Sequence, residues 1–151
     1  GVVNFTDAVY IDEGTDEEMR NSRVLKQDVL LNITGASIGR SAVYSSVGKA
    51  NVNQHVCIIR SLSNKTIPEF IHYCLSSEIG QKQIDSYQAG GAREGLNFQQ
   101  ISKISFLFPD SNEQKEIDDF LLKFDNLITL QRRKLDHLQT QKKALLQQLF
   151  V

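Results

Sequence analysis

The longest regular pattern of apolar positions lies in the last forty or so residues of the chain. Alternating steps of four and three residues from Ile117 connect ten positions, of which eight are apolar. These positions are Ile117, Leu121, Phe124, Ile128, Gln131, Leu135, Leu138, Lys142, Leu145 and Leu149. Ser111 followed by Gln114 is typical of a capping box, and residues 110–151 contain no glycine or proline. The pattern predicts one long helix over 111–151 with a coiled-coil seam.

Two features of this helix restrict how it can pair with another. Gln131 and Lys142 are polar seam positions, which weaken pairing but restrict its register and oligomeric state. Residues 113–125 carry five acidic and two basic side chains, whereas residues 126–151 carry one acidic and five basic ones. An antiparallel partner with the same polarity would bring these opposite charges together. We therefore expect an antiparallel helix pair.

The preceding residues alternate short apolar runs with polar, glycine-containing segments. Runs of strand length and composition lie at residues 24–33, at 41–44, in the second half of 52–60, and at 104–108. Thr66 as a cap, with Pro68 at an early helical position, is typical of a helix start, and apolar spacing carries that helix toward Tyr87. The sequence therefore predicts an α+β chain: a small mixed domain over 1–110, followed by the helix over 111–151.

Composition and charge narrow the class of protein. The 151 residues are 40% apolar, which is enough to bury a core, and the net charge is −1. Residues 1–18 carry six acidic side chains and no basic one, whereas residues 19–109 carry ten Lys or Arg against five Asp or Glu. The body is thus moderately basic behind an acidic segment. Apolar runs are too short to span a membrane, so we expect a cytoplasmic protein.

Cysteine and histidine spacing gives no support for a metal or catalytic site. Cys57 and Cys74 have no ligand-like spacing and are expected to be buried thiols. His55, His72 and His137 are too scattered to form a ligand set or a catalytic triad.

The segment from Gly35 to Arg40 is the first candidate binding loop, with two glycines four residues apart. Glycines allow backbone N–H groups to approach an anion, but the segment lacks a complete P-loop or GxGxxG pattern. Three interpretations remain open: a structural turn, the nucleotide loop of a small enzyme, or a loop that presents Ser37 and Arg40 to nucleic acid.

Two further polar segments have side chains suited to reading bases. Asn53, Gln54 and His55 precede an apolar strand, and residues 88–97 combine three glycines with Arg93 and Asn97. Amide side chains pair with adenine edges and arginine with guanine, although Asn, Gln and Gly are also common in ordinary turns. On residue chemistry alone, a DNA-contacting role and a structural role are both open.

Taken in order, these segments resemble the DNA-specificity (S) subunit of type I restriction-modification systems. The resemblance is carried by Asp28–Arg40, by Asn53–His55 before its strand, by Gly90–Ala92 before Leu96–Asn97, by Ile104–Pro109 before Glu113–Ile117, and by Lys142–Phe150. Members of this family normally carry two target-recognition domains, each followed by a long helix. The abrupt start at Gly1 therefore suggests a fragment or half-subunit that lacks the first part of its domain.

The resemblance implies a non-catalytic subunit that reads one half of a split site on double-stranded DNA. The paired helix would come from the other half of the subunit or from a homodimer mate, and would act as a spacer. Methylation (M) and restriction (R) subunits would supply the chemistry, with S-adenosylmethionine, ATP and magnesium. The candidate DNA contacts are Ser37, Arg40, Asn53, Gln54, His55, Arg93 and Asn97. The alternative is a structural coiled-coil adaptor that does not bind DNA.

Overall fold

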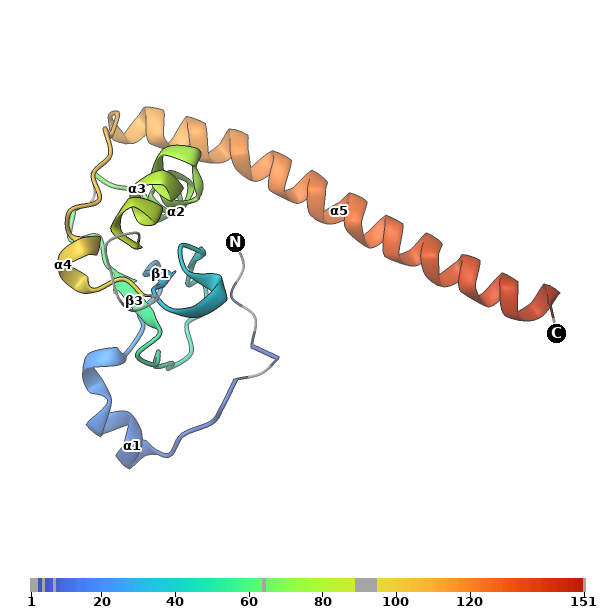
Figure 1. Cartoon of the computed structure of the whole chain (residues 1–151), viewed down its shortest axis with the longest axis horizontal. Coiled ribbons are helices and arrows are strands. Elements are labelled where there is room, and N and C mark those ends of the chain that lie inside the picture. Colours follow the sequence, from blue (N-terminus) through green and yellow to red (C-terminus); the bar gives the residue numbers. More distant parts are fainter. Residues whose placement is uncertain (1–2, 4, 7, 64, 89–94, 151) are drawn as a thin grey trace. The chain divides into compact units, whose positions relative to one another are not determined.

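A three-stranded antiparallel sheet forms the centre of the first of two compact units, Gly1–Gln114 and Lys115–Val151. The computed structural model describes residues 3, 5–6, 8–63, 65–88 and 95–150. Strand β1 (Val29–Asn32) lies between β2 (Ser41–Val43) and β3 (Val56–Ile59). Figure 1 labels β1 and β3. Leu30 is opposite both Ala42 of β2 and Ile58 of β3. The alternating burial of β1 directs one of its faces into the core.

Helices pack on this sheet and complete an α+β fold, which confirms the predicted fold class. The helices of the first unit are α1 (Glu13–Glu18), the short 3-10 helices η1 (Arg20–Ser22) and η2 (Gly35–Ser37), α2 (Pro68–Ser76), α3 (Glu78–Gln88) and α4 (Phe98–Ile101). Among them, α2 packs directly on β1 and β2, and α3 packs on α2. The buried core combines side chains from β1, β3, α2 and α3 with two from the connecting segments: Val29, Leu31, Ile33, Cys57, Leu75, Ile84 and Leu96. The core thus supports the sheet from the side covered by helices.

The helix expected to run from Thr66 toward Tyr87 is two helices. Ser77 has extended backbone angles and ends α2, and α3 begins at the next residue. A Cβ atom on Gly80 would lie 2.2 Å from the carbonyl oxygen of Cys74, so α3 can turn this closely past the end of α2 only with glycine there. The cap prediction at Thr66 was also wrong, because Ile67 occupies the cap position and Pro68 begins the helix.

The strand predicted over residues 104–108 is also wrong. These residues have no regular secondary structure. The side-chain amide of Gln83 accepts from the backbone N–H of Ser105 at 3.0 Å and donates to its carbonyl at 3.0 Å. Ile104 and Phe106 pack against the core, as they would in a strand. A side chain therefore provides the hydrogen bonds for which the sequence pattern had implied a neighbouring strand.

The C-terminal helix, α5, is confirmed over Ser111–Leu149 and has 39 residues, about 58 Å at 1.5 Å per residue. The capping box predicted from Ser111 is wrong by one residue. Asp110 caps the helix, its Oδ1 accepting from the N–H groups of Asn112 and Glu113 at 2.8 and 3.0 Å. Gln114 is buried instead of reaching back to the cap.

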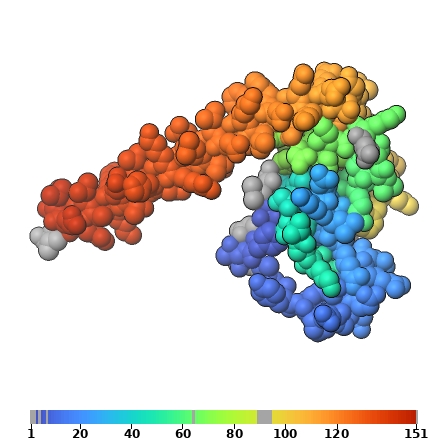
Figure 2. Space-filling model, turned by 180° about the vertical axis from the view of Figure 1, so that it is seen from behind, coloured from blue at the N-terminus to red at the C-terminus, as the bar shows by residue number. Residues whose placement is uncertain are grey.

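The apolar seam of α5 is open to solvent. Seam residues from Phe124 to Leu149 are about half exposed or more. Figure 2 shows the surface of this helix in orange to red. Pairing with a second helix therefore stays a prediction. None of the helices in the described residues is long and apolar enough to cross a membrane.

Candidate nucleic-acid interface

Three segments far apart in the sequence meet at the end of the sheet where β1 ends and β3 begins. The N–H of Ile33 donates to the carbonyl of His55 at 2.9 Å, and the carbonyl of Ile33 accepts from the N–H of Leu96 at 2.8 Å. Thr34 forms an antiparallel bridge with Gly95. Residues 33–37, 53–55 and 95–97 therefore lie side by side. We call this group the polar sheet end.

The turn before β3 occupies the centre of the polar sheet end. Asn53 organises it: its side-chain oxygen accepts from the N–H of His55 at 3.1 Å, and its carbonyl accepts from the N–H of Val56 at 3.2 Å. Gln54 is therefore presented at the tip, and its side chain is exposed. The His55 ring contacts Thr34 Oγ1 through Nδ1 at 2.5 Å and Gln54 Nε2 through Nε2 at 3.4 Å.

The Gly35–Arg40 segment joins the polar sheet end as a tight structural turn. Gly35 and Gly39 have φ values of 70° and 83°, a conformation that favours glycine. The N–H groups of Ile38, Gly39 and Arg40 all donate to carbonyls of residues 32–37. A nucleotide cradle needs such groups free to face an anion, so this geometry disfavours the small-enzyme interpretation.

The side chains of this turn differ in whether they already bind a partner within the protein. Ser37 Oγ accepts from Asn32 Nδ2 at 3.2 Å, so Ser37 already has a partner within the protein. The Arg40 side chain is exposed, and the structure records no ion pair for it within the described residues. The backbone carbonyl of Arg40 accepts from the N–H of Asn32 at 2.9 Å. Arg40 therefore lies just before β2, beside the end of β1.

The late loop contributes one described candidate. Asn97 caps α4: its side-chain oxygen accepts from the N–H of Gln100 at 2.9 Å, and Gln100 Oε1 accepts from the N–H of Asn97 at 2.8 Å. The side-chain oxygen of Asn97 is thus already used in this capping box. Arg93 and the Gly90–Ala92 segment lie outside the described residues.

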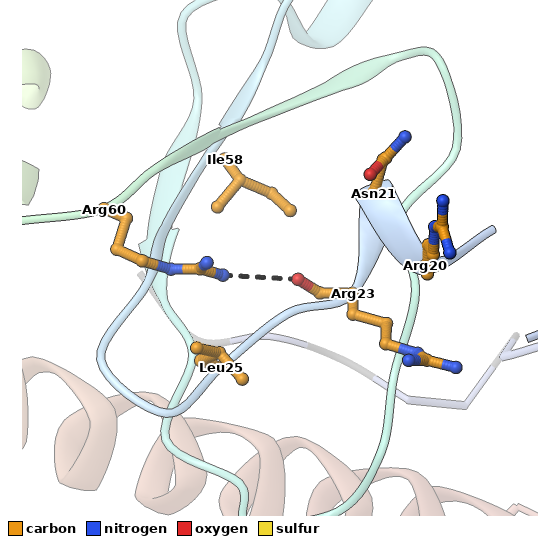
Figure 3. Close-up of a pocket in the computed structure, with 6 residues that line it drawn as sticks. All are labelled: Arg20, Asn21, Arg23, Leu25, Ile58 and Arg60. Carbon is orange, nitrogen blue, oxygen red and sulfur yellow. Dashed lines mark hydrogen bonds between the residues drawn. The ribbon is translucent and has the colours of Figure 1, made fainter. Parts of the chain in front are cut away.

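The opposite end of the sheet holds a basic pocket that the sequence analysis did not identify. It has a volume of about 470 Å³ and is lined by Arg20, Asn21, Arg23, Leu25, Ile58 and Arg60 (Figure 3). The Arg60 guanidinium points across it and donates to the Arg23 carbonyl at 3.3 Å. The six residues come from two separate stretches of the chain, 20–25 and 58–60, and no local motif marks them.

Most of the charge in this pocket is neutralised within the protein. Arg60 makes two hydrogen bonds of 2.7 Å to the buried carboxylate of Asp28, which raises the pKa of Arg60. Arg23 pairs with Asp16 and Glu17 of α1. Hydrogen bonds from Arg23 and Asn51 hold the pKa of Asp16 below its ordinary value. The bonds of Arg23 and Asn51 tie α1 to the segments that precede β1 and β3, and we assign the pocket a structural role.

Metal-ligand clusters of three or more His, Cys, Asp or Glu side chains do not occur in the part of the chain that the structure describes. Burial raises the pKa of the Cys57 and Cys74 thiols. Both cysteines are free thiols; Cys57 is buried as expected, but Cys74 is only half-buried, so the expectation was wrong for Cys74.

Comparison with known sequences identifies the family of this chain. The sequence profile of the type I restriction modification DNA specificity domain matches residues 7–140. The chain belongs to this family. A Methanocaldococcus jannaschii protein assigned as the specificity subunit of the type I restriction enzyme MjaX is 28% identical over 98% of this chain. The EcoBI specificity subunit of Escherichia coli is 29% identical over 78% of it.

These two relatives are much longer than the chain. The alignments span 36% of the M. jannaschii protein and 24% of the E. coli protein. Each match therefore covers most of this chain but only a minor part of the relative.

Proposed function

We propose that residues 1–110 of this chain read one half of a split site on double-stranded DNA, as part of a type I specificity subunit. The observation that carries this proposal is the polar sheet end, where side chains with hydrogen-bonding capacity converge from residues 33–37, 53–55 and 95–97, with Arg40 beside them just before β2. Membership of the DNA specificity family supports the same assignment. Side chains on turns at the end of a rigid sheet suit base reading, because the sheet holds them in position at little entropic cost.

The candidate contacts divide by the partners they already have. Arg40 is exposed and suited to a phosphate or a guanine edge. Gln54 and His55 are exposed on a turn that Asn53 holds. Ser37 and Asn97 are committed in part to Asn32 and Gln100, and so have reduced capacity for DNA. Arg93 completes the proposed set.

We infer that residues 111–151 pair antiparallel with a second helix, from the other half of the subunit or from a homodimer mate. The half-exposed seam supports this, because exposed apolar stripes on helices are typical of interaction surfaces. At about 58 Å, α5 is long enough to separate two reading domains by more than one DNA turn of about 34 to 36 Å. Methylation and restriction subunits dock on this assembly and supply the catalysis, and this chain acts as a non-catalytic subunit.

The test uses the complete specificity subunit assembled with its methylation subunits. Arg40→Ala should weaken binding to the target duplex and lower the slope of log Kd against log salt by about 1, if Arg40 neutralises one phosphate. Arg20→Ala is the matched control, because Arg20 is also exposed but lies at the opposite end of the sheet. Normal assembly without a footprint on any DNA would contradict the proposal and favour the adaptor alternative.

A further inference from the structure

We propose that Gln54 reads an adenine in the half-site, and that His55 and Thr34 are positioning residues that orient its amide. This rests on the proposed DNA-reading function and specifies which group at the polar sheet end selects which base. The backbone beneath Gln54 is held on two sides. The neighbouring β1 extension binds His55 through Ile33 N–H, and the Asn53 side chain binds His55 N–H within the turn.

The hydrogen-bond directions follow from the chemistry of the three groups. The amide nitrogen of Gln54 faces His55 Nε2 at 3.4 Å, and an amide nitrogen only donates, so Nε2 is the acceptor. The ring proton is then on Nδ1, which donates to Thr34 Oγ1 at 2.5 Å. Thr34 is itself fixed by its bridge to Gly95. The chain of contacts thus runs from the sheet, through Thr34 and His55, to the amide of Gln54.

The contacts from Thr34 through His55 leave most of the Gln54 amide available to a base. One N–H faces His55, while the carbonyl oxygen and the second N–H have no partner recorded within the described residues. An adjacent acceptor and donor match the N6 amino group and the N7 atom of adenine in the major groove. No other natural base presents that pair in that order there, so the oriented amide selects adenine.

The other amides of the polar sheet end are less suited to this task. The Asn53 oxygen accepts from His55 N–H, and the Asn97 oxygen accepts from Gln100 N–H. The Asn32 nitrogen donates to Ser37 Oγ. The oxygens of Asn53 and Asn97 thus serve the fold, and the Asn32 amide belongs to a half-buried residue of β1. Gln54 donates one N–H to His55, but it is exposed at the tip of its turn, and its oxygen and second N–H have no partner recorded within the described residues.

The experiment measures Kd for the assembled complex on target duplexes in which each adenine of the half-site is replaced in turn by 7-deazaadenine. This base keeps Watson–Crick pairing and the N6 amino group but lacks the N7 acceptor. At one position the substitution should weaken wild-type binding by about 2- to 15-fold, the value of one hydrogen bond. With Gln54→Ala the same substitution should have no effect, and discrimination against guanine there should fall by roughly 5- to 150-fold.

The positioning roles need a measurement that a general loss of stability would not change. We use the ratio of the Kd for the 7-deazaadenine duplex to the Kd for the adenine duplex at that one position. Thr34→Val removes the hydroxyl and should lower the ratio toward 1, whereas Thr34→Ser should restore it. His55→Ala should act like Thr34→Val. Asn21→Ala removes an exposed amide at the opposite end of the sheet and should leave every ratio unchanged.

Two results would overturn the inference, and they separate it from the proposed function. If the wild-type complex binds its target specifically but tolerates 7-deazaadenine at every position, Gln54 does not read adenine, while DNA reading stands. If Gln54→Ala keeps the full 7-deazaadenine effect, another residue makes that contact. Absence of any sequence-specific binding by the wild-type complex would instead remove the proposed function itself.

Discussion

The side-chain oxygen of Gln114 accepts a hydrogen bond of 3.0 Å from the backbone N–H of Ile67, the residue before α2. The nitrogen of the same amide donates to the carbonyls of Lys65 and Pro109 at 2.9 and 2.8 Å. Gln114 is 1% exposed, so one buried amide satisfies three backbone groups from two segments. It fastens the first turn of α5 to the remainder of its own unit.

Replacing Gln114 by alanine should lower the free energy of unfolding of the first unit by about 2–3 kcal/mol. The physical reason is that three backbone groups lose their hydrogen-bond partner at a buried site, where water cannot easily replace it. Denaturant unfolding monitored by circular dichroism measures the change. Gln99→Ala, at an exposed glutamine of α4, should shift the same value by no more than about 0.5 kcal/mol. Equal effects of the two variants would contradict the assignment.

Gly80→Ala should destabilise the junction between α2 and α3. The added methyl group would lie 2.2 Å from the Cys74 carbonyl oxygen and 2.7 Å from that of Leu75, so the backbone must shift. We expect a loss of about 2–3 kcal/mol in thermal unfolding, typical of overpacking at a buried site. Gly48→Ala is the control, since its Cβ would meet only Ser46 Oγ at 3.5 Å. A neutral Gly80→Ala would show that the junction relaxes easily.

The ion pair between Asp16 and Arg23 predicts an acid-dependent contribution to stability. The pKa of Asp16 in the folded chain is below its ordinary value of 3.8, so the unfolded chain binds the proton more tightly. The contribution is therefore complete above pH 3.8 and is lost as the pH falls through the lower folded value. Asp16→Asn should be less stable than wild type at pH 7, and the difference should shrink toward pH 2.

Unfolding free energies measured between pH 2 and 7 would show this convergence. Glu18→Gln is the matched control, because it removes an exposed carboxylate of the same helix for which no bond is recorded in the described structure. Its stability curve should run parallel to that of wild type. A constant difference for Asp16→Asn across the whole range would contradict the ion-pair explanation.

Leu138→Asp should abolish pairing of α5 while leaving the first unit folded. A buried charge on a coiled-coil seam costs about 3 kcal/mol or more, which corresponds to at least roughly 150-fold weaker association. Sedimentation velocity measures association, and circular dichroism checks the fold. Gln147→Asp adds the same charge on the face opposite the seam and should pair normally. If Leu138→Asp still pairs, the seam is assigned wrongly.

Sequence patterns were most informative where the determining interactions are local. The spacing from Ile117 to Leu149 predicted the long helix, because a repeat of seven residues places its apolar side chains on one face of a helix without reference to the rest of the chain. The sheet strands were predicted in order but with bounds too long, since the ladder between β1 and β3 ends where Asn32 pairs with Val56. The split at Ser77 depends on how α3 packs past α2, which the apolar spacing alone does not encode.

The sequence by itself determined the order of elements, the long helix with its seam, and the set of polar segments that resembles one family. Tertiary structure decided which of those polar side chains serve the fold and which remain available. Thr34 and His55 are 21 residues apart, yet strand pairing brings their side chains to 2.5 Å. Asn97 and Gln114 carry similar amides, but one caps α4 and the other is buried. The physical reason is that a hydrogen-bond partner is set by contacts between distant segments, which residue type and spacing do not specify.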